Sequence, residues 1–322
     1  MFKLLHPVLR IDRREVEFAR RGFACRHADL RDRFEYVGGI FLKGYHLALE
    51  QDDPHRCADQ LDQIENEHRG FAYEGAAMAF ALLDGITPRR KWKLFQQFVE
   101  GPGHKHIYMA YIGAGWACAR LPWLRRRIES VITTLHPVLF PLIIDGYGFH
   151  EGFFHWRTPL RRKVERLSEH ARHAFYQGLG RSLWFIHGAD GREIQHTILS
   201  FAPQFRGDGW SGAGLACAYA GGPGRNEMEE LLCAAECYWP ALAQGAAFAA
   251  KARQFAGNPA AHTEIACNVL CGMSAASASA LCDETLLDVS HMHPSPYQHW
   301  RELLQKRLSC QAVPVNRVAH VS

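Results

Sequence analysis

One short pattern recurs along the chain and constrains the fold more than any other feature: a glycine that begins a run of small or apolar residues. The occurrences are Tyr73-Glu-Gly75, Tyr111-Ile-Gly113, His150-Glu-Gly152, Tyr176-Gln-Gly178, Trp210-Ser-Gly212, Ala243-Gln-Gly245 and Leu270-Cys-Gly272. Successive glycines are 38, 39, 26, 34, 33 and 27 residues apart. This period is typical of helical-hairpin repeats.

Glycine inside a helix lowers its stability by about 1 kcal/mol relative to alanine. Its repeated use therefore indicates a gain elsewhere. The gain we expect is close approach of helix backbones, because glycine and alanine leave little side chain between neighbouring helices. We predict about six to seven helical hairpins whose inner helices pack tightly side by side.

The predicted fold class is all-α, in a single repeat domain over residues 1–322 with peripheral segments at 1–20 and 303–322. Long windows such as 59–68 and 227–243 have apolar residues three and four apart, and strand signals are poor. The hairpins form either a closed α/α toroid or a compact solenoid around an apolar, aromatic-lined cavity. We favour a compact or closed form over an open solenoid, because the glycine-rich helices carry too few charges to line a solvated concave face.

Composition argues against several classes of function. The formal net charge of +4 is small and evenly spread, so nucleic-acid binding is not expected. No apolar window is long enough for a membrane span, and the N-terminus is broken by His6, Pro7 and Arg10, unlike a signal peptide. We expect a cytoplasmic protein with reduced cysteines. Basic segments at 123–127 and 159–166 are either solvated helix faces or docking surfaces for an acidic partner.

The stretch YGFHEGFFHWR, residues 147–157, is close to the zinc-protease motif HExxH but has one residue too many. His150 and His155 are five apart and diverge by about 140° on a regular helix, so we expect no metal site. A metal would instead need His150, Glu151, His155 and His104 from another repeat. Glu151 and His155 are four apart and form either a general acid–base pair or a buried hydrogen bond between helices.

Three further charged residues lie in apolar segments. Asp145 precedes a glycine, so we expect a turn or helix-cap residue, although its side chain could equally point into the cavity. Arg181 needs a partner if buried, either a carboxylate such as Asp190 or Glu74, or an anionic ligand. Glu74 occupies the same place in its repeat as Glu151, and the two carboxylates could converge on a central axis or bind neighbouring repeats.

Aromatic residues are plentiful around these positions. They form either an ordinary core or a pocket for an unsaturated or polycyclic substrate, whose cationic character the rings would stabilise. The candidate substrate-binding residues are Tyr73, Tyr147, Phe154, Trp184, Trp210 and Tyr219. Nucleotide binding is not expected, because no Walker or complete dinucleotide fingerprint is present.

The repeat segments RGFAYEGAAMAFALLDG, YIGAGWACARL, DGYGFHEGFFHW, YQGLGRSLWFIHGAD, WSGAGLACAYAGG and AQGAAFAAKAR together resemble one bacterial family. This family is the domain of unknown function 1702, and the resemblance covers roughly residues 10–302. It implies a role in the maturation of enediyne or related unsaturated polyketides. The activity of the family is undefined, so the resemblance carries over no catalytic residue.

Two functional hypotheses follow. In the first, an apolar polyene enters the cavity and is isomerised or cyclised without a dedicated cofactor. The catalytic candidates are Glu151, His155, His150, Asp145, Glu74 and Arg181. In the second, the protein is a non-catalytic carrier or scaffold that shields a reactive polyene or docks carrier and other biosynthetic proteins. Convergence of the charged residues in one enclosed pocket would favour the enzyme.

Overall fold

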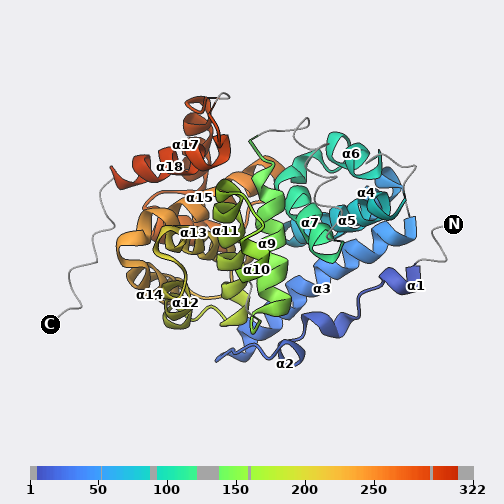
Figure 1. Ribbon diagram of the computed structural model, residues 1–322, viewed down its shortest axis with the longest axis horizontal. Helices are drawn as coiled ribbons and strands as arrows, with labels where there is room; N and C mark the ends of the chain where they lie inside the picture. Colours follow the sequence, from blue (N-terminus) through green and yellow to red (C-terminus); the bar gives the residue numbers. More distant parts are fainter. Residues whose placement is uncertain are drawn as a thin grey trace.

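The computed structural model describes residues 6–51, 53–87, 93–121, 138–158, 161–290 and 293–310, and every regular element in these ranges is helical. Seven inner helices pack side by side in chain order (Figure 1). They are α3 (Ala28–Gln51), α5 (Asn66–Ile86), α7 (Ile107–Arg120), α9 (Pro141–His155), α11 (Glu169–Ile186), α13 (Pro203–Ala220) and α15 (Trp239–Ala256). The prediction of an all-α fold is confirmed for the described residues.

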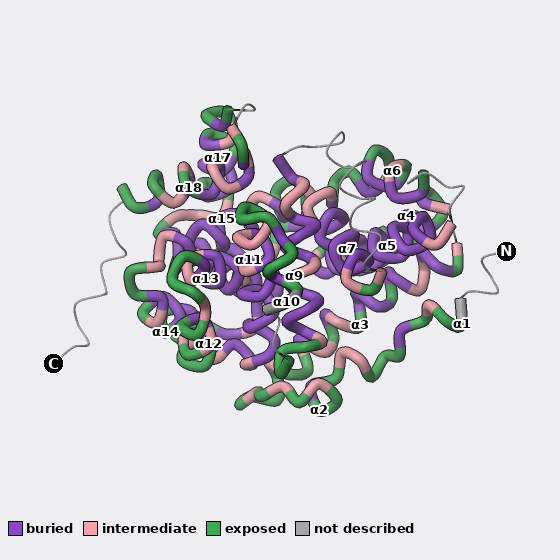
Figure 2. The backbone as a smooth tube through the Cα atoms, viewed as in Figure 1, coloured by how far each residue is buried: buried purple, intermediate pink, exposed green. Residues whose placement is uncertain are grey.

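Shorter helices connect the inner ones and form a second layer, in which α12 contacts α14 and α14 contacts α16. The connecting helices are α4 (Pro54–Leu61), α6 (Lys93–Glu100), η3 (His104–His106), α10 (Arg161–Val164), α12 (Gly191–Leu199), α14 (Arg225–Ala235) and η4 (Glu236–Tyr238), and α16 (Ala261–Leu270) follows the last inner helix. The chain begins with α1 (His6–Leu9), η2 (Arg13–Val16) and α2 (Phe18–Arg21), and ends with α17 (Ala275–Leu287) and α18 (Pro296–Ser309). Figure 2 shows burial concentrated in the inner helices.

The row of inner helices is strongly curved. Phe34 of α3 packs against Phe185 of α11 with ring centroids 5.1 Å apart, and Phe71 of α5 packs against Tyr219 of α13 at 5.2 Å. In the same way, Tyr108 of α7 packs against Phe255 of α15 with ring centroids 5.7 Å apart. Each pair is four places apart in the row, and a straight row with helices about 8–10 Å apart could not bring them together.

Close backbone contact at glycines joins the inner helices, as the sequence predicts. A Cβ atom added to the repeat glycine of any of six helices would lie 1.9–2.1 Å from a backbone carbonyl oxygen of the preceding inner helix. The six glycines are Gly75, Gly113, Gly146, Gly178, Gly212 and Gly245. Any side chain would force the backbones apart, because real Cβ atoms do not come this close to backbone atoms.

The register of the repeat differs from the predicted one at two positions. In α9 the glycine against the preceding helix is Gly146, which meets the carbonyl oxygen of Ile112, whereas Gly152 meets the Ser182 side chain in α11. The spacings on either side of Gly146 are then 33 and 32 residues instead of 39 and 26. Gly272 is not in an inner helix: it follows the end of α16 with a φ of 69°.

This register also corrects two expectations about carboxylates. Asp145 is the residue before Gly146 and lies inside α9, so it is not a turn or cap residue. Glu74 precedes Gly75, and its counterpart in the repeat is therefore Asp145 and not Glu151. Helix caps are supplied elsewhere, for example by Ser168 and Asp190, which accept hydrogen bonds from the first turns of α11 and α12.

Some sequence predictions fall partly outside the described residues. The basic segment 123–127 lies wholly outside them, as do residues 1–5 and 311–322 of the predicted peripheral segments. Among the described residues, no single helix is long and apolar enough to cross a membrane. One pair, α16 with α17, passes by length and composition only when taken together, and it is bent by 68°.

We expect Gly212→Ala to destabilise the protein by about 3 kcal/mol or more, because the new methyl group would overlap the α11 backbone. The added Cβ would lie 1.9 Å from the carbonyl oxygen of Gln177 and 2.6 Å from the nitrogen of Arg181. Gly39→Ala is the matched control, since this helical glycine has no atom within 4 Å of an added Cβ. It should gain about 0.5–1 kcal/mol. Urea unfolding measures both, and equal effects would refute the close-packing argument.

Candidate functional site

Three charged side chains from three inner helices meet in the interior. They are Glu74 of α5, Asp145 of α9 and Arg181 of α11, and all are buried. The Arg181 guanidinium donates a short hydrogen bond to Asp145 Oδ1, and Gln177 Nε2 donates to Asp145 Oδ2 at 2.9 Å. A buried arginine and carboxylate are retained together because either one alone would be an uncompensated charge. The prediction that Asp190 could be the partner of Arg181 is wrong, because Asp190 forms an ion pair with Arg26.

The repeat explains why these residues converge. Glu74 and Asp145 each precede a repeat glycine by one residue, and Arg181 follows Gly178 by three. Positions four residues apart lie on one face of a helix. Because the glycines hold the helices in a constant register, this face points the same way in each repeat.

Glu74 is the titratable group of this cluster with a pKa near neutrality. Burial raises the pKa of Glu74 from its ordinary 4.5 to about 7, and the Asp145 carboxylate acts in the same direction. The Arg181 charge and the nearby Trp116 indole lower this pKa, but not enough to offset burial. Burial also raises the pKa of Asp145, which the Arg181 guanidinium and two hydrogen bonds oppose. Glu74 can therefore both hold and release a proton near pH 7.

Glu74 and Arg181 line a cavity of about 60 Å³, which we call the first cavity. Its wall is mostly aromatic. The aromatic lining residues are Phe18, Phe34, Phe41, Phe71, Trp116, Phe149, Phe153, Phe154 and Phe185. The Arg181 guanidinium lies 5.0 Å from the Phe149 ring centre. Two buried donors in the wall, Arg181 Nε and Trp116 Nε1, have no hydrogen-bond partner of ordinary geometry among the described residues.

The chain's N-terminal segment forms one side of the first cavity. Ile11, Glu15, Val16 and Phe18 line it. The segment is tied to α3 by two hydrogen bonds: the Phe18 backbone N–H donates to Glu35 at 2.8 Å, and the Tyr45 hydroxyl donates to the Leu9 carbonyl oxygen at 2.7 Å. These ties close the cavity on the side of η2 and α2.

The HEGFFH residues form a separate cluster at the end of α9. Glu151 is buried, and its Oε2 is 3.3 Å from His155 Nδ1 and 2.5 Å from Lys163 Nζ. The predicted Glu151–His155 pair is present, but His155 and Lys163 are each 44% exposed. Burial lowers the pKa of His150 well below its ordinary value, so this ring is neutral at pH 7.

The expected divergence of His150 and His155 is not found. Their ring centroids are 6.1 Å apart, and one ligand atom from each of His150, Glu151 and His155 lies within 4.8 Å of the others. The two rings approach because His155 is the last residue of α9 and turns towards Glu151. A metal here would have to displace Lys163 from Glu151. The remaining metal candidate, His104, lies in η3 against Phe255, outside this cluster.

The six predicted substrate-binding aromatics are dispersed. Phe154 lines the first cavity and Tyr219 a second one. Tyr73 instead packs against His106 with ring centroids 4.2 Å apart, and its hydroxyl donates to Asp62 at 3.1 Å. Trp184 is fully buried and donates to the Gly221 carbonyl oxygen at 3.2 Å. Tyr147 packs edge-on against Phe175, and Trp210 is buried in the core; neither lines these two cavities.

Sequence reasoning missed the polar residues that precede the later repeat glycines. Gln177 joins Asp145 to the Tyr297 hydroxyl of α18, with 2.9 Å on each side. Ser211 donates to Gln244 at 2.9 Å, and Arg301 of α18 reaches Gln244 at 3.3 Å. Gln177, Ser211 and Gln244 each precede a repeat glycine, as Glu74 and Asp145 do, and this shared position is the signal that could have identified them.

A family model described as "Protein of unknown function (DUF1702)" matches residues 1–308. No curated protein and no solved structure matches the chain.

The raised pKa of Glu74 predicts a pH dependence of stability. The folded protein binds this proton more tightly than the unfolded chain, so the contribution of Glu74 is fully present below about pH 4.5 and is lost as the pH rises through about 7. The difference in unfolding free energy between wild type and Glu74→Gln should fall by about 3 kcal/mol from pH 4.5 to 8. Urea unfolding across this range measures it, and a constant difference would contradict the raised pKa.

Proposed function

We propose that this chain, which belongs to the DUF1702 family of proteins of unknown function, is an enzyme that moves protons on an apolar, unsaturated small molecule in the first cavity. The outcome would be an isomerisation or a cyclisation. The observation that carries the proposal is Glu74, a buried carboxyl group with a pKa of about 7 in a mostly aromatic wall. A general acid or base is most effective when its pKa is near the working pH.

Each charged residue then has a distinct task. Protonated Glu74 gives its proton to one carbon of a conjugated substrate, and the resulting carboxylate removes a proton from another carbon. The number of protons and electrons is unchanged, so this step needs no cofactor. The positive charge that develops on the substrate is stabilised by the ring faces of Trp116 and Phe149. Arg181 and Asp145 remain paired throughout the reaction, so the charge around Glu74 changes only through Glu74 itself and the substrate.

For the substrate we retain the class that the sequence resemblance implies, a polyene or enediyne-type polyketide intermediate, delivered in the cytoplasm with or without a carrier protein. The aromatic wall supports an unsaturated ligand, because ring faces pack well against conjugated chains. The curvature of the inner row supports a closed, toroid-like arrangement, in which the first cavity lies on the axis.

Entry requires the first cavity to widen. Its volume of about 60 Å³ accommodates only a few water molecules. The N-terminal segment is the wall that can move without separating the inner helices, since it lies outside their row and contacts α3 through side chains such as Val16, which packs against Gly38. We therefore propose that residues 11–18 open to admit the substrate.

The Glu151–His155 pair is the second candidate for proton transfer. Neither residue lines the first cavity, but His150 and Phe154 connect the pair to it: the His150 ring is 5.5 Å from Trp116 and 4.7 Å from Phe154. In the proposal, Glu151 closes the end of α9 by holding Lys163 and His155, and Glu74 performs the chemistry.

A non-catalytic carrier or scaffold is the alternative function. One observation favours it: the Glu151 carboxylate is already held by Lys163. A carrier would bind the polyene without exchanging its protons, and this difference can be measured.

The test is solvent deuterium incorporation into a linear conjugated tetraene acid, parinaric acid, followed by mass spectrometry and ultraviolet absorption. Wild type should incorporate deuterium as it isomerises the chain. Glu74→Gln should slow incorporation by about 10²–10⁴-fold, since it removes the proton carrier. Glu151→Gln is the matched variant and should keep most of the rate. No incorporation by wild type, or loss only in Glu151→Gln, would overturn the assignment to Glu74.

A further inference from the structure

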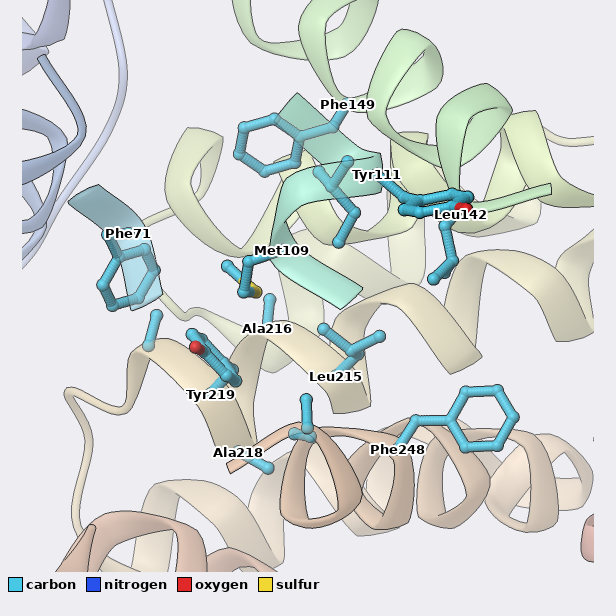
Figure 3. Close-up of a cluster of buried hydrophobic side chains, with 14 of the residues drawn as sticks. Phe71, Met109, Tyr111, Leu142, Phe149, Leu215, Ala216, Ala218, Tyr219 and Phe248 are labelled. Carbon is cyan, nitrogen blue, oxygen red and sulfur yellow. The ribbon is translucent and has the colours of Figure 1, made fainter. Parts of the chain in front are cut away.

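A second cavity, of about 30 Å³, lies in the same interior. Its wall is almost entirely apolar, and it is lined by Tyr108, Met109, Ile112, Leu139, Leu142, Leu215, Tyr219, Phe248, Ala249, Lys251, Ala252, Tyr297 and Trp300. Figure 3 shows Met109, Leu215, Tyr219 and Phe248 from three inner helices around this part of the core. Nothing in the proposed proton transfer uses it.

The two cavities are lined by equivalent positions of the repeat. In the first cavity, Trp116, Phe149 and Arg181 each follow a repeat glycine by three residues. In the second, Leu215 and Phe248 follow Gly212 and Gly245 by the same interval. Because the same helix face lines both, the cavities belong to one interior surface that passes from α5–α11 to α13–α15.

One pair of aromatic rings joins the walls of the two cavities. Phe71 lines the first, Tyr219 lines the second, and their centroids are 5.2 Å apart at 78° (Figure 3). The buried Tyr219 hydroxyl lies beside the Asn258 amide and against Gly70, and the Arg253 guanidinium lies 4.3 Å from its ring centre. A chain that passes from one cavity into the other must displace this pair of rings.

The joined space would be polar at one end only. The first cavity offers Arg181 Nε, a buried donor with no hydrogen-bond partner of ordinary geometry among the described residues, together with the Trp116 indole and protonated Glu74, which interact with each other. Buried donors without acceptors are costly unless a ligand satisfies them. The far end, at Phe248, Ala252 and Trp300, offers only apolar contact.

We propose that the two cavities form one elongated site for a linear apolar chain with a carbonyl oxygen at one end. The oxygen accepts hydrogen bonds in the first cavity, and the tail passes between Phe71 and Tyr219 into the second. This inference rests on the proposed function for the identity of the reacting end. It adds that the length of the apolar chain determines which molecules bind, because the second cavity accommodates a tail of limited length.

The experiment measures binding and not turnover. Parinaric acid methyl ester, whose fluorescence rises in an apolar site, is displaced by 2-alkanones of 8 to 16 carbons. Affinity should increase about fourfold per methylene until the tail fills the second cavity and then level off. Alkanes of equal length should bind more weakly than the ketones, and Trp116→Phe should reduce this preference. A flat length profile, or equal binding of alkanes, would overturn the proposal.

Two variants at the far end of the second cavity test whether this cavity limits the length of the bound chain. Ala252→Leu should move the plateau to shorter ketones, because the added side chain occupies the second cavity. Phe248→Leu should move it to longer ones. Gly39→Ala, on the outer face of α3, is the control and should leave the whole profile unchanged. Equal plateaus in all four proteins would show that the tail does not enter the second cavity.

The outcomes separate this inference from the proposed function. Glu74→Gln should keep the dependence on length while it loses proton exchange. If the length profile holds but wild type exchanges no deuterium, the site exists and the protein is a carrier. If wild type exchanges deuterium but the profile is flat, the enzyme assignment stands and the second cavity is ordinary core.

Discussion

The architecture depends on the contact between a glycine Cα of one inner helix and a backbone carbonyl oxygen of the preceding one. Six such contacts recur with added-Cβ distances of 1.9–2.1 Å, so neither helix can move or turn without a collision. Backbones this close also allow Cα–H groups to approach carbonyl oxygens, a weak but recurrent attraction. The contacts set both the spacing and the rotation of every inner helix.

This constant rotation has a chemical consequence. It turns the same face of each helix inward, so polar residues before the repeat glycines are buried whatever their character. Asp145, Gln177 and Gln244 form hydrogen bonds with Arg181, Tyr297 and Arg301 respectively. At Glu74 the Arg181 charge and the Trp116 indole lower the pKa, but burial outweighs both. Glu74, the group best suited to proton transfer, is therefore the carboxylate before a repeat glycine whose burial is less compensated by hydrogen bonds than that of Asp145.

The sequence predicted much of the fold and less of the site. The glycine repeat indicated the hairpins and their close packing, because the effect of a missing side chain is local and recurs at a regular spacing. It misplaced Gly152 and Gly272, because a pattern of letters does not show which glycine touches a neighbour. Asp145 looked like a cap for the same reason: Asp-Gly favours turns locally, but tertiary contact with Arg181 outweighs that preference.

Residue type and spacing by themselves determined that this chain is helical, that its inner helices pack closely and that Glu151 and His155 form a pair, since all of these depend on neighbours within a turn or on side-chain size. Only the tertiary structure decided which charged groups meet. Glu74, Asp145 and Arg181 lie far apart in the chain, and their convergence results from the summed rotation of four consecutive inner helices. Small changes in each rotation would add up, and no local signal in the sequence records that sum.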